Sequence, residues 1–379
     1  MKHNASLVKT VSNLAYEFNQ TAADHDKSGA FPFANFQRLR EEGLLGLLSL
    51  EEYGGAGGGL LDATIVVNGI ARGEPATALV LAMHYIQHAT MAVRGWPPHI
   101  IEALARETVS EVSIINALRV EPELGTPTRG GVPQTKAVKS GEGWRISGHK
   151  LFSTGIPILR WLAVWGVTDE PEPRVGTFLV HADTPGIKII ETWNQLGMRA
   201  TASHDVILDN VYLPSDHAVE LYPVGSGFSA DTTQAIWSAV LLGALYDGVA
   251  RSARDWFYDF LKNRKPASLG ASLATLPRIQ DLVGEIEALL AVNDRLLNTA
   301  AHDVDAGRAL ASGESAIIKM AVTSNAIAVV EAAIKVTGNP GLAIKNPLER
   351  HFRDVLCARI HTPQDDTVRI GAGKRALGV

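Results

Sequence analysis

The chain has 379 residues, of which 46% are hydrophobic and 20% charged, and its formal net charge is −5. This length and composition can bury the cores of two or three domains, while the negative balance excludes nucleic-acid binding through a global positive field. The only cysteine is Cys357, which excludes an intramolecular disulfide and a metal site built on several cysteines.

Residues 1–112 are predicted to form a helical domain, because their apolar residues recur three and four positions apart. The glycine-rich stretch at 54–59 follows no predicted strand and precedes no GK[ST] sequence, so it indicates a loop rather than a phosphate site. The N-terminus lacks the apolar run of a secretory signal. The longest apolar stretch, near 236–246, is about half of the ~20 residues that a membrane span needs. We therefore expect a soluble, cytoplasmic protein.

Residues 113–221 change to short β-rich runs, each bounded by Gly, Pro, Asp or Asn. Seven such runs predict an antiparallel β-barrel or sandwich. They are SIINAL, TKAVKS, GWRISG, WLAVWGVT, GTFLVHA, GIKII and DVILDNVYL.

Residues 222–379 return to long helical patterns at 235–261, 276–301 and 316–336, and residues 264–275 read as a connecting loop. Their wide apolar stripes predict packing on more than one face, as in a four-helix bundle. The chain is thus expected to be a multi-domain α+β protein with an N-terminal helical domain, a middle β-barrel and a C-terminal four-helix bundle. The junction between the β module and the helices is where a ligand is expected.

The sequence offers flavin-type chemistry more readily than metal or nucleophile chemistry. His84 and His88 would share a helical face, but no third ligand is near them in sequence, so no metal site is predicted. A flavin site needs an aromatic or apolar wall, backbone donors and an anion site. The turn at 148–155 supplies Phe152, Ser153 and Thr154 for these roles. Taken alone, Phe152 fits a core position equally well, and the two hydroxyls fit turn caps equally well.

Several ordered motifs resemble the acyl-CoA dehydrogenase superfamily over nearly the whole chain. The stretch at 176–214 is similar to its β-domain signature, and GSGF at 225–228 follows it at the expected place. PLERHFRD at 347–354 and EEYGGAGG at 51–58 resemble two further motifs of this family. The resemblance implies FAD, with FMN as an alternative, held between barrel and bundle. It also implies a homotetramer or homodimer.

Carried over position by position, the resemblance places Phe152 against the flavin ring and Thr154 near its N5 and O4 edge. Arg264 would reach the pyrophosphate of a neighbouring subunit's FAD. The candidate cofactor-binding residues are Glu121, Gly125, Thr126, Phe152, Ser153, Thr154, Arg264, Gly338 and Gly341.

The chain departs from the family where substrate would bind. The Asp-x-x-Arg pair that many members use to hold substrate falls near Ile236 and Ala239, which are apolar. The usual Glu-Gly-Thr motif of the catalytic base is replaced by HTPQDDTVR at 361–369, so the matching positions are Asp365 and Asp366. This stretch is also similar to the dibenzothiophene-monooxygenase branch, whose His-Thr signature makes His361 a candidate.

Three functions therefore remain open. The first is an acyl-CoA dehydrogenase that uses Asp365 as base, with Asp366 as the next candidate, and passes electrons to an electron-transfer partner. The second is a two-component monooxygenase that uses reduced flavin from a partner reductase and O₂ on a small aromatic or sulfur compound, with His361 at its site. The third is a flavin-binding protein without catalysis.

Overall fold

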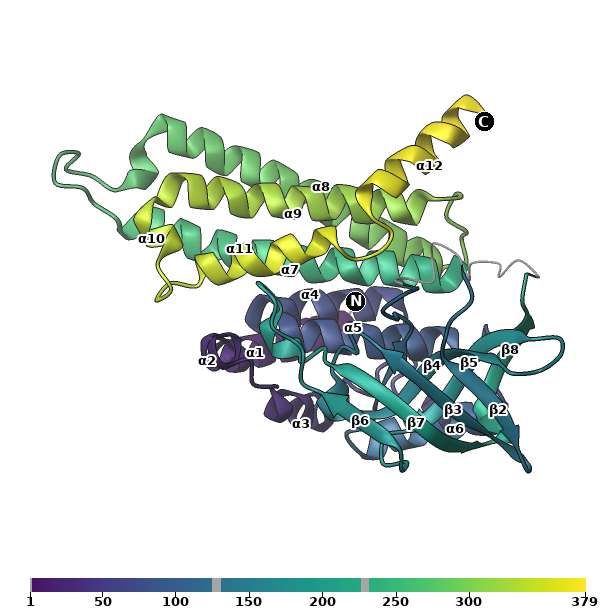
Figure 1. Cartoon of the computed structure of the whole chain (residues 1–379). Coiled ribbons are helices and arrows are strands. Elements are labelled where there is room, and N and C mark those ends of the chain that lie inside the picture. The colour runs from purple at the N-terminus through teal and green to yellow at the C-terminus, as the bar shows by residue number, and fades with distance from the viewer. Residues whose placement is uncertain (1, 125–130, 226–231) are drawn as a thin grey trace.

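The protein is described from a computed structural model covering residues 2–124, 131–225 and 232–379. Figure 1 shows long helices of the C-terminal part on one side, the sheet at the opposite corner, and the N-terminal helices α4 and α5 between them. The predicted fold, with an N-terminal helical domain, a middle sheet domain and a C-terminal helical domain, is confirmed.

The N-terminal domain is built around α5, which is buried along nearly its whole length. This helix packs on α7 of the bundle and on β1 of the sheet, so its apolar residues face two partners. Pro75 starts it at a position where the missing N–H costs nothing. The helices of this domain are α1 (Lys2–Asn19), α2 (Ala22–Ser28), α3 (Phe33–Glu41), α4 (Leu60–Gly73), α5 (Pro75–Thr90) and α6 (Pro98–Ser110).

Among the described residues the sheet has eight strands in the order β6-β7-β3-β2-β4-β5-β8, with β1 also pairing with β4. All seven predicted runs form strands, and β8 is an addition that the sequence pattern did not indicate. Five of the seven pairings are antiparallel, but β1 and β2 each run parallel to β4. Long connections between these strands allow the parallel pairs, whereas tight turns would not. The strands are β1 (Ile114–Leu118), β2 (Lys136–Ser140), β3 (Gly143–Lys150), β4 (Leu159–Thr168), β5 (Arg174–His181), β6 (Ile187–Ile190), β7 (Asp205–Pro214) and β8 (Ala218–Pro223).

The C-terminal domain centres on α9, which packs against α7, α8 and α11. By length and composition α9 is apolar enough to cross a membrane, and half of its most apolar window is buried inside the protein. A helix surrounded by other helices needs this composition. The helices are α7 (Thr232–Asn263), α8 (Pro277–Asp305), α9 (Glu314–Thr337), α10 (Asn339–Leu342), α11 (Leu348–Leu356) and α12 (Asp365–Leu377), which projects from the bundle (Figure 1).

The glycine-rich stretch at 54–59 is a loop that leads into α4. The two carboxylate oxygens of Asp305, at the end of α8, accept hydrogen bonds from the N–H groups of Leu60 and Leu61 at 2.7 and 2.9 Å. A Cβ on Gly59 would lie 2.5 Å from that carboxylate, so glycine is required there for this close approach. The loop therefore serves the junction between the N-terminal domain and the bundle.

Candidate active site

The turn after β3 presents an exposed aromatic ring from a strained backbone. Phe152 has φ of 54° and is 53% exposed, and its ring lies edge-to-face with that of Trp193, with the ring centroids 6.4 Å apart. Bulky residues rarely occupy this region of backbone space, and such strain persists where the surroundings enforce it. Here the N–H groups of Ser153 and Gly155 donate to the carbonyls of His204 and Thr201.

Hydroxyl groups line the next position of the turn. Ser203 Oγ donates to Thr154 Oγ1 at 3.0 Å, and Ser203 Oγ lies 2.8 Å from Thr201 Oγ1. The backbone carbonyl of Thr154 accepts from Asn116 Nδ2 at 3.0 Å. Ser153 Oγ is buried and has no hydrogen-bond partner among the described residues. A buried hydroxyl without a partner is uncommon, so this turn is suited to receive a polar ligand atom.

The loop that supports this turn is itself anchored to the bundle. Residues 192–204 include Met198 and Ala202, both with positive φ. The N–H of Met198 donates to Asp354 Oδ1 at 2.7 Å, and Arg353 donates to the Leu196 carbonyl at 3.0 Å. Burial raises the pKa of Asp354 to about 7. Arg353 also pairs with Asp26 of α2, so one point on α11 joins all three domains.

Glu121 lies inside the sheet domain and not on a ligand-facing surface. Its carboxylate accepts from Lys150 Nζ at 2.6 Å, and Lys150 is fully buried. It also accepts from the Thr135 hydroxyl and from the N–H groups of Gln134 and Thr135. Burial would raise the pKa of Glu121, but the bonds from Lys150 and Thr135 outweigh it and lower the pKa. Any role of this side chain at a cofactor is therefore indirect.

Lys319 of α9 holds the segment that carries the candidate bases. Its buried ammonium donates to the carbonyls of Ala358, His361 and Pro363 at 3.2, 2.8 and 3.1 Å. His361 is half-buried, and the centroid of its ring lies 5.8 Å from that of Tyr246. Burial, and to a smaller extent the positive charge of Lys319, lowers the pKa of His361 to about 4. This histidine is therefore neutral at physiological pH.

Asp365 and Asp366, adjacent in sequence, have different surroundings. Asp365 Oδ1 is buried and has no hydrogen-bond partner among the described residues. The negative charge of Asp365 acts to raise the pKa of Lys319, although burial lowers that pKa more. Asp366 is exposed and accepts from the N–H of Thr367. Both stand in the first turn of α12, where the helix dipole favours a carboxylate. Of the two, only Asp365 has a buried oxygen without a hydrogen-bond partner among the described residues.

The remaining predicted residues lie elsewhere. Arg264 is exposed in the connection after α7, Gly338 precedes α10 as its N-cap, and Gly341 lies within α10; Figure 1 shows both regions at the end of the bundle remote from the sheet. Gly341 is packed so closely that a Cβ would lie 2.0 Å from Thr337 Oγ1. Gly125 and Thr126, like most of the GSGF motif, lie outside the described residues. Arg264 and the two glycines thus belong to the end of the bundle away from the sheet, whereas Phe152 follows strand β3 of that sheet.

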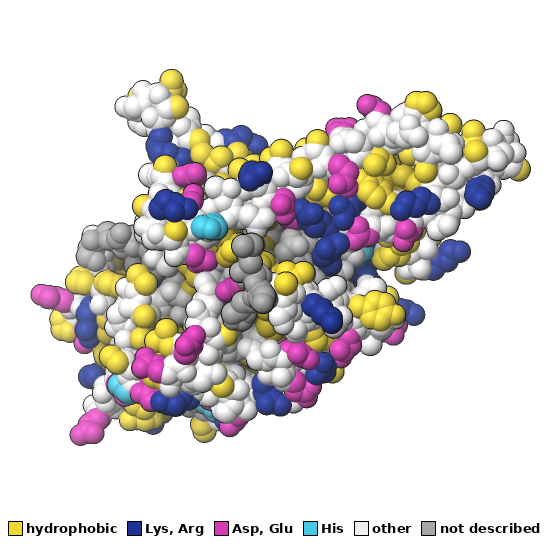
Figure 2. All heavy atoms as spheres, turned by 180° about the vertical axis from the view of Figure 1, so that it is seen from behind, with side chains coloured by type: hydrophobic (Ala, Val, Ile, Leu, Met, Phe, Trp, Pro, Cys, Tyr) yellow, Lys and Arg dark blue, Asp and Glu magenta, His cyan; other side chains and the backbone are white. Residues whose placement is uncertain are grey.

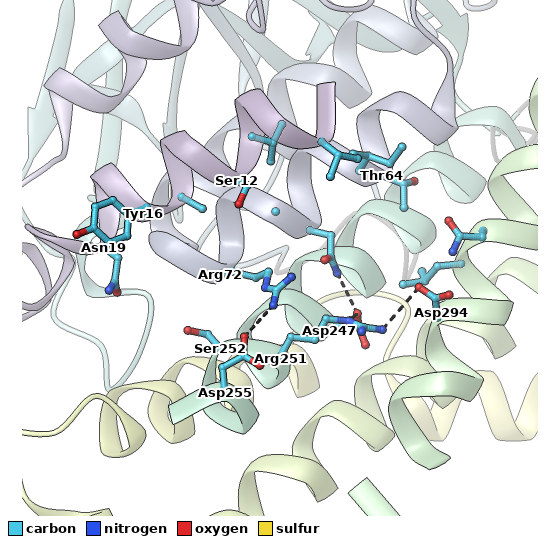
Figure 3. A pocket seen from close by; sticks show the side chains of 18 residues that line it. Ser12, Tyr16, Asn19, Thr64, Arg72, Asp247, Arg251, Ser252, Asp255 and Asp294 are labelled. Atoms are coloured by element: carbon cyan, nitrogen blue, oxygen red, sulfur yellow. Dashed lines mark hydrogen bonds and ion pairs between the residues drawn. The ribbon is translucent and has the colours of Figure 1, made fainter. Parts of the chain in front are cut away.

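A pocket of about 490 Å³ lies between α1, α4, α7 and α8, and none of the predicted site residues lines it (Figure 3). Its charged groups pair with one another: Arg72 with Asp255 at 2.8 Å, and Arg251 with Asp247 at 2.6 Å. The opposite face of the molecule from that in Figure 1 carries basic and acidic side chains interspersed (Figure 2). The described residues contain no group of three or more His, Cys, Asp or Glu side chains that could hold a metal ion.

Sequence reasoning missed the supporting residues of the site, namely Asn116, Trp193, Thr201, Ser203 and Lys319. The first four are polar or aromatic residues on strands and loops distant in sequence, and their contacts arise only from the fold. Lys319 carried a signal, since a lysine between apolar residues of a helical pattern has to find acceptors when it is buried.

Comparison with known proteins agrees with this architecture. Family models for acyl-CoA dehydrogenase match the N-terminal domain at residues 2–95, the middle domain at 119–211 and the C-terminal domain at 240–365. The putative acyl-CoA dehydrogenase YdbM of Bacillus subtilis is 34% identical over 364 residues, which are 95% of this chain and 94% of that protein. The chain belongs to the acyl-CoA dehydrogenase family. It is therefore a member of a family of flavin-dependent oxidoreductases.

Proteins named for other reactions are also similar to this chain. The amino sugar nitrososynthase RubN8 of Streptomyces rubradiris is 30% identical over 362 residues, covering 90% of this chain and 82% of that protein. The structure of KijD3 in complex with FMN and dTDP-3-amino-2,3,6-trideoxy-4-keto-3-methyl-D-glucose superposes with a TM-score of 0.87 and 26% identity. That match covers 99% of this chain and 93% of that chain. Family membership thus leaves the reaction of this acyl-CoA dehydrogenase homologue to the chemistry of its own site.

Proposed function

We propose that the turn at Phe152 binds flavin and that the protein is an acyl-CoA dehydrogenase with Asp365 as its base. Three features of the turn fit a flavin. Phe152 offers an exposed ring, Thr154 offers a hydroxyl at the flavin's N5 and O4 edge, and Ser153 has a buried hydroxyl without a described partner. FAD is the proposed form, with FMN as the alternative.

The single observation that carries the reaction is the buried, unpartnered oxygen of Asp365. A base has to be desolvated and open toward substrate before it can take a proton from a carbon acid. Asp365 would remove the α-proton of an acyl thioester while the β-hydride leaves with its electron pair, giving the α,β-unsaturated thioester. Bound flavin would accept that hydride and then pass two electrons to an electron-transfer partner.

A second candidate is a two-component monooxygenase, and it is favoured by the first turns of α7. Ile236 and Ala239 stand where many family members hold substrate with an Asp and an Arg, and Ala239 is 1% exposed. Such a site can enclose a small uncharged compound without a thioester clamp. In that reaction His361, which is neutral at physiological pH, would be the candidate acid–base residue.

Anaerobic reduction tests the proposal. The flavin-loaded protein is mixed with a panel of acyl-CoA thioesters, and bleaching of the flavin's visible absorbance is followed. Asp365→Asn should keep flavin bound and lose at least ~100-fold in reduction rate, the lower range of general-base catalysis. Asp366→Asn is the matched control, because its carboxylate is exposed, and it should reduce like the wild type.

Two results would overturn this assignment. Wild-type reduction rates in Asp365→Asn would place the base elsewhere. If no thioester bleaches the wild-type flavin but a flavin reductase with O₂ supports oxygenation of an added compound, the monooxygenase replaces the dehydrogenase.

We further propose that Arg264 serves the flavin of a second copy of the chain in a homotetramer or homodimer. Its exposure in the connection after α7, at the end of the bundle away from the sheet, supports this, since a guanidinium there can meet a phosphate group brought by a neighbour. Arg264→Ala should weaken flavin retention without unfolding the protein. The exposed Arg295 on the middle of α8 provides a control, because Arg295→Ala should retain flavin normally. Equal retention in both variants would contradict the assignment.

A further inference from the structure

The ammonium group of Lys319 has as many hydrogen-bond acceptors as it has protons. Lys319 belongs to α9 and is 0% exposed, and its Nζ donates to the backbone carbonyls of Ala358, His361 and Pro363. A lysine ammonium carries three protons, whereas the neutral amine carries two. The three bonds can therefore form together only while Lys319 is charged, and they leave no proton for a fourth acceptor.

The three carbonyls belong to the segment that leads into α12. Pro363 precedes Asp365, the proposed base in the first turn of α12, by two residues. Asp365 Oδ1 is buried and has no hydrogen-bond partner among the described residues. The position of this carboxylate therefore depends on the backbone that leads to it, and Lys319 fixes that backbone from a neighbouring helix.

Lys319 also acts on Asp365 through its charge. Burial lowers the pKa of Lys319, and the negative charge of Asp365 acts in the opposite direction. This attraction is mutual, and a nearby cation favours the ionised form of a carboxylate. The other titratable or charged groups of this region are His361, Tyr246 of α7 against the ring of His361, and Asp366 and Arg369 on α12. His361 is neutral at physiological pH, and water screens the exposed Asp366 and Arg369, so Lys319 is the buried cation that interacts with Asp365.

We propose that Lys319 is a positioning residue for the proposed dehydrogenation, which places Asp365 through the three carbonyls and keeps it ionised through its own charge. This inference rests on the proposed role of Asp365 as the base. That role needs both effects, because a base has to be aimed at the α-carbon and deprotonated before it can take a proton. Lys319 is assigned no bond to the substrate, since the backbone already engages its three protons.

A neutral and a charged substitution of the lysine separate the two effects. Lys319→Met loses the hydrogen bonds and the charge, so flavin reduction by an acyl-CoA thioester should be about 100-fold slower even where the base is ionised, the loss expected of a misplaced group. As the pH falls, its rate should also decline about one pH unit earlier than that of the wild type, because the carboxylate is protonated more readily without the cation. Lys319→Arg keeps a charge and donors, so its rate should decline at the wild-type pH even if its maximum is lower.

The experiment measures the rate of anaerobic flavin reduction against pH in the full-length, flavin-loaded protein, with the thioester that reduces the wild type fastest. Amide hydrogen exchange over residues 356–369 gives a readout independent of activity, and it should be faster in Lys319→Met because the anchor of this segment is lost. Lys374→Met is the matched control, because Lys374 is an exposed lysine nine residues beyond Asp365 on α12. It should leave the pH profile and the exchange unchanged.

The outcomes separate this inference from the proposed function. If Asp365→Asn reduces flavin at the wild-type rate, the proposed base is wrong and the role of Lys319 fails with it. If Asp365→Asn is slow but Lys319→Met keeps the wild-type pH profile, the base is retained and the role of Lys319 is overturned, even when the variant is slower at every pH. If neither Lys319 variant folds with flavin bound, Lys319 supports the whole bundle rather than the segment before α12, which also contradicts the proposal.

Discussion

Substituting Lys150 with methionine should destabilise the sheet domain strongly, because this side chain is fully buried with a carboxylate partner. Lys150 Nζ is fully buried and donates to Glu121 Oε1 and to the Trp165 carbonyl. Burial lowers the pKa of Lys150 to about 8, so the ammonium is charged at neutral pH. Methionine has a similar length but no charge. The variant therefore leaves the carboxylate of Glu121 buried without its cation.

The structure sets the size of the effect. Breaking a buried ion pair by removing one partner costs about 3 to 5 kcal/mol, mostly because the other charge is stranded. The remaining donors to Glu121, from Thr135 and Gln134, soften the loss toward the lower figure. In Lys150→Met with Glu121→Gln no charge is stranded, so the double variant should recover about 1 to 3 kcal/mol relative to additivity.

Denaturant unfolding at neutral pH, followed by fluorescence, would measure these free energies. Lys136→Met is the control, because Lys136 is an exposed lysine whose carboxylate partner, Asp169, is 3.6 Å away. It should cost less than about 1 kcal/mol, as surface ion pairs do. If Lys150→Met is as mild as the control, or if the two substitutions at the pair simply add, the buried charges do not act as described.

Two further predictions concern acid stability and helix capping. Burial lowers the pKa of His84 to about 4, so below pH 6.5 the unfolded chain binds a proton that the folded protein does not. As the pH falls from 6.5 to 4, the free energy of unfolding should therefore decrease by up to about 1.4 kcal/mol per pH unit because of this group. His84→Gln should make the free energy of unfolding depend less steeply on pH over this range. Asp305→Ala removes the cap on Leu60 and Leu61 and should cost about 1 kcal/mol in denaturant unfolding, whereas an unchanged value would show that water replaces the cap.

The fold was predictable because its elements are separated by turn residues and differ in hydrophobic period. The seven β-runs stand between Gly, Pro, Asp and Asn, and α7, α8 and α9 repeat apolar residues over many turns. The strand β8 was not anticipated. Its sequence AVELYP places Glu220 among apolar residues, and the structure shows why that is tolerated, since Glu220 pairs with buried Arg94. Sequence alone does not reveal this partner, which lies more than a hundred positions away.

The site was only partly predictable, because the sequence gives residue types but not the directions in which their side chains point. Glu121 fits a cofactor role by motif, yet its partner Lys150 turns it inward. The sequence favoured Asp365 over Asp366 by position alone, and the beginning of α12 distinguishes them physically, because only Asp366 is exposed. The turn at Phe152 could be proposed from sequence because aromatic, hydroxyl and glycine residues are contiguous there. Its support from Ser203 could not be found, since it depends on the path of a distant loop.

The position of Arg353 restricts how a ligand can enter. From α11, its guanidinium donates hydrogen bonds to Asp26 of α2 and to the Leu196 carbonyl of the sheet domain. These bonds would have to break before either domain could rotate away from the bundle. Rigid-body opening at this point is therefore costly compared with the rearrangement of a few side chains or a short segment. Access to the Phe152 turn should then be governed by local motion, on the timescale of loops and side chains rather than of hinged domains.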